Sequence, residues 1–404
     1  MSDPAEGKNS VAEQAHGAVY EDGDGFSDFS DSELVTLQEE AMIDSCGATS
    51  IPEKIVLQNE GNDIQVNIKN DLDTTVDIHR GDRGECSGSY QNSPGSPQTK
   101  RKRLPQTPME KYRMKYLWVT NLCSQTWCEQ QMVYELEFPE FLVTEKSAVM
   151  NAGSSIHLAR ELEVHDVVSV KTQTREDTWA IKLLNILSMI PILQSGSHIR
   201  EFPVFGVLNG VFMAGVIDEL GYSSKGELEL RELKTRGSRS LPRGAQKRSH
   251  QFQVSLYKLL FDGMVSGGLQ PELFFQHLYL KPEQSLGPQV IEHASKVGFI
   301  ASNFKELLEL ACLNLTFSDL PMIDSLKMEY CYQEDSSLLG CEFVIFEREM
   351  VLEQLTFYLA FWKGLRETQG VDIEEAWKCQ RCSFSNICEW RTRKSACIQT
   401  KRTK

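Results

Sequence analysis

The chain has 404 residues, a 41% hydrophobic composition and a formal net charge of −15. This length and apolar content allow one large domain or two modest ones, and they exclude a fibrous or collagen-like protein. The most apolar stretch, Ala180 to Leu193, contains Lys182 and Pro191 and is shorter than the roughly 20 apolar residues of a membrane span. We therefore expect a core helix there and no membrane association.

Residues 1–108 differ in character from the rest of the chain. Residues 21–40 contain eight acids and no Lys or Arg, and the remainder is rich in Ser, Gly, Asp and Asn, which predicts a disordered acidic tail. Its Gly25–Leu34 patch mixes aromatic and acidic residues, as a partner-binding motif or an ordinary linker would. The basic cluster Lys100–Arg103 fits nuclear import, a phosphate contact or a charged linker. The acidic, polar start lacks the features of a secretory or mitochondrial presequence.

Hydrophobic density rises at Met109, so we expect a folded domain over 109–392 and a basic flexible tail over 393–404. The Asn209-Gly210 pair between two strand-like runs predicts a hairpin with a type I′ turn. The periodicity predicts helices at 145–166, 176–194, 244–263 and 347–364, and strands at 199–208, 211–220, 227–234, 273–280, 327–332 and 342–346. This mixture predicts an α/β fold with helices around a mixed central sheet.

Two carboxylates and a lysine are candidates for a hydrolytic site. Residues two apart in a strand share a face, so Glu232 and Lys234 are expected to project together. Asp218 lies near the end of the preceding strand, where strand pairing would bring it alongside them. Carboxylates bind Mg²⁺, which activates water, and an ammonium offsets charge on phosphoryl oxygens, so this set suits phosphodiester hydrolysis. The alternative is a solvated strand face or a surface ion pair.

Three further polar residues flank these strands. His157, on an expected helix, is either a metal ligand or substrate contact, or a structural histidine. Gln253 and Tyr257 are four residues apart on the helix that follows the Glu232 strand, so they share one face of it. They either support the site or are half-buried packing residues.

Three of the 11 cysteines lie close together near the end of the chain, as Cys379-x2-Cys382-x5-Cys388. In an intracellular protein such cysteines are expected to be reduced, which favours metal ligation over disulfides. The spacing fits zinc, a redox dithiol or an iron–sulfur cluster. The candidates for a fourth ligand are Cys128 and Cys123, about 250 residues upstream, and the alternative is a set of buried thiols.

Taken in order, these motifs resemble a known family of nucleases. A helical His157, Gly215-Val-Ile-Asp218, Glu232-x-Lys234 and Gln253-x3-Tyr257 resemble the RecB-like branch of the PD-(D/E)xK nuclease superfamily. A single distant cysteine before these motifs and a cysteine trio after them is similar to its iron–sulfur members. The segments His157-Leu-Ala-Arg-Glu-Leu-Glu, Arg200-Glu-Phe-Pro-Val-Phe-Gly and Glu374-Glu-Ala-Trp-Lys-Cys bring the chain closest to the eukaryotic exonuclease V family, over roughly 109–392.

The resemblance implies a RecB-like core whose N- and C-terminal segments are joined by a 4Fe–4S cluster. The implied cluster ligands are Cys128, Cys379, Cys382 and Cys388. The implied ligands of one or two Mg²⁺ ions are His157, Asp218 and Glu232. Lys234 would be the catalytic lysine, with Gln253 and Tyr257 in support.

The resemblance also implies a Mg²⁺-dependent exonuclease acting on single-stranded DNA in DNA repair and genome maintenance. We expect a monomer in the nucleus and also the cytoplasm, with a mitochondrial address disfavoured because no presequence is visible. The acidic tail would contact a single-strand-binding protein or another repair protein. Two other hypotheses remain: a non-catalytic DNA-binding scaffold with the same fold and cluster, and a zinc-stabilised protein with an unrelated activity.

A basic segment follows the Glu232 strand and reverses the acidic average of the chain. Residues 231–248 contain seven Lys or Arg and one acid. The residues expected to contact DNA phosphates are Arg236, Arg239, Arg243, Lys247 and Arg248. The alternative is a solvated basic loop.

Overall fold

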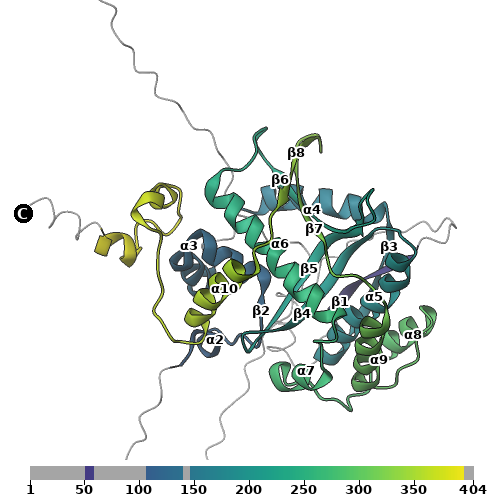
Figure 1. The fold of residues 1–404 in the computed structure, drawn as a ribbon. Coiled ribbons are helices and arrows are strands. Elements are labelled where there is room, and N and C mark those ends of the chain that lie inside the picture. The colour runs from purple at the N-terminus through teal and green to yellow at the C-terminus, as the bar shows by residue number, and fades with distance from the viewer. Residues whose placement is uncertain (1–50, 59–105, 140–145, 395–404) are drawn as a thin grey trace, which may run out of the picture.

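The computed structural model describes residues 51–58, 106–139 and 146–394 (Figure 1). The Gly25–Leu34 patch, the Lys100–Arg103 cluster and residues 395–404 lie outside the described residues, so the predictions made for them stay predictions. The described part is a mixed α/β structure with a central mixed sheet and helices packed around it (Figure 1). The predicted fold class is confirmed at this level.

The central sheet has six strands, β2, β4, β5, β6, β7 and β8, and β1 pairs with β3 in a second sheet of two. The strands span Ile51–Gln58 (β1), Leu117–Trp118 (β2), His165–Thr172 (β3), Ile199–Leu208 (β4), Val211–Tyr222 (β5), Leu228–Arg236 (β6), Ser325–Tyr332 (β7) and Leu338–Val344 (β8). The β4–β5 hairpin is confirmed. Its turn residues Asn209 and Gly210 have φ angles of 48° and 74°, as a type I′ turn requires.

The helices and one 3₁₀ segment surround this sheet. They span Pro108–Lys111 (α2), Val119–Glu137 (α3), Lys146–Leu162 (α4), Arg175–Gln194 (α5), Gly244–Val265 (α6), Pro271–Leu278 (α7), Pro288–Lys296 (α8), Phe304–Phe317 (α9), Arg348–Trp362 (α10) and Ile373–Gln380 (η2). On β4, Phe202 packs against Phe261 of α6, whereas Phe205 packs against Trp179 of α5. Residues three apart on a strand point to opposite faces, so α5 and α6 cover opposite faces of the sheet.

Strand β5 opens a fork in the sheet. Along one edge it pairs antiparallel with β4 from Val211 to Leu220. On its other edge, β2 pairs only with Met213 and Ala214, and β6 pairs only from Glu219 to Tyr222. After Arg231, the partner of Glu219, β6 no longer pairs with β5. Along its other edge β6 pairs in parallel with β7, which pairs antiparallel with β8. Asp218 is thus the residue of β5 at which the two strands separate.

Two elements differ from the sequence expectation. The strand predicted at 273–280 is wrong, because Pro271–Leu278 is the helix α7 with Pro271 in its first turn, where the missing N–H costs nothing. Strand β3 was not expected, and neither was its partner β1, which lies inside the segment predicted to be disordered. Among the described residues, no helix is long and apolar enough to cross a membrane.

Candidate active site and cysteine centre

The side chain of Asp218 lies inside the fork between β5 and β6. It is 1% exposed, and its Oδ2 accepts a hydrogen bond of 2.7 Å from the backbone N–H of Leu233. Leu233 stands between Glu232 and Lys234, so this bond holds the Asp218 carboxylate beside both. The predicted meeting of Asp218 with the Glu-x-Lys motif is therefore present in the structure.

Glu232 and Lys234 form an ion pair next to Asp218. The Lys234 Nζ lies 3.3 Å from Glu232 Oε1, and both side chains are largely buried. Burial raises the pKa of Asp218 to about 6, while the Lys234 ammonium and the Leu233 N–H act in the opposite direction. Lys234 thus stabilises the ionised form of a carboxylate that has lost its contact with water.

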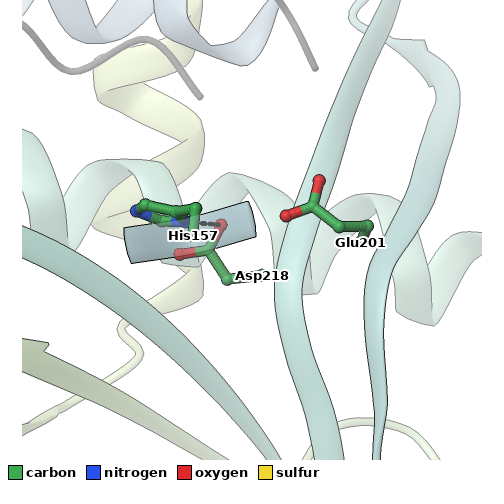
Figure 2. A group of neighbouring side chains, drawn as sticks. All are labelled: His157, Glu201 and Asp218. Carbon is green, nitrogen blue, oxygen red and sulfur yellow. Dashed lines mark ion pairs between the residues drawn. The ribbon is translucent and has the colours of Figure 1, made fainter. Parts of the chain in front are cut away.

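A group suited to a metal ion lies at the same place and contains His157, Glu201 and Asp218. One ligand atom from each residue lies within 4.8 Å of the other two. Figure 2 shows the His157 imidazole beside the Asp218 carboxylate, with Glu201 turned towards them from β4. His157 Nδ1 is 3.7 Å from Asp218 Oδ1, a buried oxygen that accepts no hydrogen bond. This geometry fits a divalent cation, because three potential ligand atoms lie close together and Asp218 Oδ1 has lone pairs that no hydrogen bond uses.

Glu201 is the residue that our sequence reasoning missed. It lies in the β4 segment Arg200–Pro203, where Arg200 pairs with Glu219 and Phe202 with Ile217, so Glu201 stands opposite Asp218. Its φ angle of 54° is unusual for a residue other than glycine. The adjacent charged residues Arg200 and Glu201, in a strand whose other residues are apolar or glycine, were the available signal. Glu232, predicted as a ligand, lies outside this metal-compatible group of described residues.

Gln253 and Tyr257 are packed into the core behind β5. They are 1% and 0% exposed, and Gln253 Nε2 donates a 3.0 Å hydrogen bond to the Tyr257 hydroxyl. A Cβ atom at Gly215 would lie 2.4 Å from Tyr257 Cε1, so glycine is required where this ring meets the strand. The structure thus places both residues as supports of β5 rather than as an exposed DNA-binding face.

The five basic residues predicted to contact DNA have different surroundings. Arg236 is 6% exposed, and its Nε donates to the backbone oxygen of Ser240, so it stabilises the loop from within. Arg239 is exposed and pairs with Asp335 at 2.7 Å, and Lys247 pairs with Glu342 at 2.7 Å. Arg243 is exposed at the start of α6, and Arg248 pairs with Glu375.

The four predicted cluster cysteines meet in one place. They line a single cavity at the C-terminal end of the fold, together with Tyr134, Lys378 and Arg391: Cys128, Cys379, Cys382 and Cys388. All four are free thiols, and Cys123 is buried elsewhere. At Cys128 the backbone of α3 leaves helical geometry, with φ −165° and ψ 107°, which interrupts the helix where it meets the C-terminal cysteines.

The donor set fits a metal centre. Burial raises the pKa of the Cys128 thiol to about 12, and the nearby Cys382 and Cys379 act in the same direction. Burial also raises the pKa values of Cys379 and Cys382. Thiols whose pKa values are raised in this way, those of Cys128, Cys379 and Cys382, remain protonated on their own, and a bound metal stabilises their thiolates. Sulfur ligands of this number suit either zinc or an iron–sulfur cluster.

Protein contacts also join α3 to the C-terminal segment. Arg366 makes two bonds of 2.6 and 2.5 Å to the Glu129 carboxylate, and the Glu129 side chain is 4% exposed. Lys378 Nζ donates to the backbone oxygen of Trp127 at 2.9 Å and lies 4.7 Å from the centre of its ring. The cysteine centre therefore lies inside an interface that side chains also hold.

Comparison with known proteins decides the family. A model of "Exo5: Exonuclease V - a 5' deoxyribonuclease" matches residues 107–232, 223–309 and 299–391. The chain belongs to the exonuclease V family. A curated exonuclease V from Danio rerio is 50% identical over 286 residues, which are 70% of this chain and 73% of that protein. The resemblance recognised in the motifs is thereby confirmed.

The exonuclease V match spans both centres. His157, Glu201, Asp218, Glu232, Lys234 and the four cavity cysteines all lie inside the matched residues. Among solved structures, the crystal structure of SSO0001 matches with a TM-score of 0.34 and 13% identity, covering 70% of this chain and 93% of that one. A score this low supports no conclusion about the fold.

Proposed function

We propose that this member of the exonuclease V family is a Mg²⁺-dependent 5′ exonuclease that degrades single-stranded DNA. The observation that carries the proposal is the buried Asp218 carboxylate. One of its oxygens is held by the Leu233 N–H, and the other, which accepts no hydrogen bond, lies beside His157. The family description as a 5′ deoxyribonuclease supports DNA as the substrate and the 5′ polarity.

The residues around Asp218 divide the chemistry between them. A bound Mg²⁺ would supply an activated water and offset charge on the phosphoryl oxygens. Asp218, His157 and Glu232 would hold the ion, and Glu232 also keeps the Lys234 ammonium 3.3 Å from its own carboxylate. Lys234 thereby remains where negative charge develops on the substrate. Gln253 and Tyr257 support β5 from behind and so fix the position of Asp218.

For the second centre we propose a 4Fe–4S cluster on Cys128, Cys379, Cys382 and Cys388, in a RecB-like nuclease core. The cavity that they share and the family match support this assignment over isolated thiols. Since Cys128 is on α3 and the others follow α10, the cluster would fasten the two ends of the folded domain together. Iron and sulfide analysis of anaerobically purified protein separates it from a zinc centre.

The remaining expectations form part of the same proposal. The exposed Arg243 and the paired Arg239, Lys247 and Arg248 lie on the loop and helix that follow β6. We propose that they contact DNA phosphates. We propose a monomer acting in nuclear DNA repair, with the acidic tail as its contact to a single-strand-binding protein or another repair protein.

The direct test is the Asp218→Asn variant, with Asp319→Asn at an exposed turn as the matched control. Single-stranded DNA labelled at either end is incubated with each protein, with and without Mg²⁺. We expect Asp218→Asn to be about 100-fold slower or worse, and Asp319→Asn to match the wild type. Degradation of single strands from the 5′ end should require Mg²⁺. Undiminished cleavage by Asp218→Asn would overturn the assignment.

A further inference from the structure

We infer that Glu201 is a further direct ligand of the divalent ion proposed for His157, Asp218 and Glu232. The inference rests on the proposed function, because it concerns the same ion. It assigns a metal-binding role to a residue that stands outside the Asp and Glu-x-Lys motifs.

The spacing of the three side chains fits one ion. Mg²⁺ binds its ligands at about 2.1 Å in octahedral geometry, so adjacent ligands lie about 3 Å apart and opposite ones about 4.2 Å apart. The ligand atoms of His157, Glu201 and Asp218 lie within 4.8 Å of one another before any ion is placed among them. These separations approach those of ligand atoms around a single ion.

The buried oxygen of Asp218 is the independent sign of a ligand. Asp218 is 1% exposed, and its Oδ1 accepts no hydrogen bond although it faces the other two residues. A buried acceptor without a donor is costly unless a cation or water binds it. The nearby Arg200 forms an ion pair with Glu219 at 2.5 Å.

The backbone at Glu201 supports the same conclusion. Its φ of 54° lies in the left-handed region, and β4 resumes its pairing with β5 on both sides of this residue. A side chain other than glycine is disfavoured in that conformation, and such strain is concentrated at functional sites. In Figure 2 the Glu201 carboxylate is turned from β4 towards Asp218. The strained residue is thus the one that completes the ligand group.

Two substitutions separate charge from backbone strain. Glu201→Gln keeps the size of the side chain and removes its charge, whereas Glu201→Gly removes the side chain and relieves the strain. Asp319→Gly is the matched control, because Asp319 also has a φ of 54° but lies at an exposed turn. Asp218→Asn reports on the proposed function itself. The probe is Mn²⁺ alone, titrated by calorimetry into the full-length, cluster-loaded protein, with melting temperatures measured in chelator and in Mn²⁺.

We expect both Glu201 variants to bind Mn²⁺ at least tenfold more weakly than the wild type. In chelator they should melt at or above the wild-type temperature, because repulsion of Asp218 and, in the glycine variant, backbone strain are removed. Asp319→Gly should keep wild-type Mn²⁺ affinity. Wild-type affinity in both Glu201 variants, with affinity lost in Asp218→Asn, overturns the role of Glu201 alone. Wild-type affinity in Asp218→Asn as well overturns the proposed function. If Glu201→Gln melts below the wild type in chelator, the Mn²⁺ affinity of Glu201→Gly tests the role of Glu201. Weaker binding supports Glu201 as a ligand, and wild-type binding overturns it.

Discussion

Replacing Gly215 by alanine tests how β5 is fixed against α6. The added Cβ would lie 2.4 Å from Cε1 and 3.0 Å from Cδ1 of Tyr257, and 3.3 Å from Cγ2 of Val119. Carbon atoms in contact are normally about 3.5 to 4.0 Å apart, so the Tyr257 ring must move by about 1 Å or more. Tyr257 is fully buried and bonded to Gln253, which leaves it little freedom to move.

Overpacking of this kind costs about 1 to 3 kcal/mol of unfolding free energy, and the severity of the contact favours the upper end. Gly263→Ala is the matched control, because Gly263 lies inside α6 and has no atom within 4 Å of an added Cβ. Alanine is favoured over glycine in a helix by about 0.5 to 1 kcal/mol, so the two variants should differ by about 2 to 4 kcal/mol.

Urea unfolding of the two variants and the wild type measures this difference, provided that the m-value stays constant. Since Gly215 stands three residues before Asp218 on the same strand, Gly215→Ala should also lower nuclease activity. Equal unfolding midpoints for Gly215→Ala and Gly263→Ala would refute the reasoning that Tyr257 holds β5 in place.

Three further predictions concern the C-terminal interface and one buried histidine. Cys379→Ser should lower both the melting temperature and the activity, and lost activity with unchanged melting would contradict a structural cluster. Arg366→Ala leaves the buried Glu129 carboxylate without its cation and should cost about 3 kcal/mol of unfolding free energy. A change under about 0.5 kcal/mol, as at an ordinary surface position, would contradict the role of this ion pair in joining α3 to the C-terminal segment. Burial lowers the pKa of His293 below its usual 6.5, so the unfolded chain binds more protons below that pH and stability falls as pH drops through this window. His293→Gln should flatten this loss between pH 7 and 5.5, and an unchanged pH dependence of unfolding would exclude His293 as its source.

The hairpin shows what could be predicted from local sequence. Asn209 and Gly210 specify a type I′ turn through their own conformational preferences, so β4 and β5 were predicted nearly to the residue. The segment 273–280 shows the opposite case. Its apolar run is too short to distinguish helix from strand by periodicity, and Pro271, the signal for a helix start, stood just outside the predicted element.

The part of the candidate site that depends on local sequence could be predicted, as the hairpin could. The Glu-x-Lys spacing fixes a shared strand face, and the motif order brought Asp218 and His157 into the prediction. Glu201 could not be recognised in this way, because its role depends on the register between β4 and β5 and on a left-handed backbone conformation. A glutamate in the sequence does not predict that conformation. The buried state of Arg236 and the ion pairs of Lys247 and Arg248 depend on tertiary contacts as well.

The most direct measurement of the central claim is an anomalous difference map from a crystal soaked in Mn²⁺. Our account predicts a peak about 2.1 Å from Asp218 Oδ1, with His157 and Glu201 among its other protein ligands. No peak at the fork between β5 and β6, or a peak out of reach of Asp218, would contradict the conclusion that these side chains bind the catalytic ion.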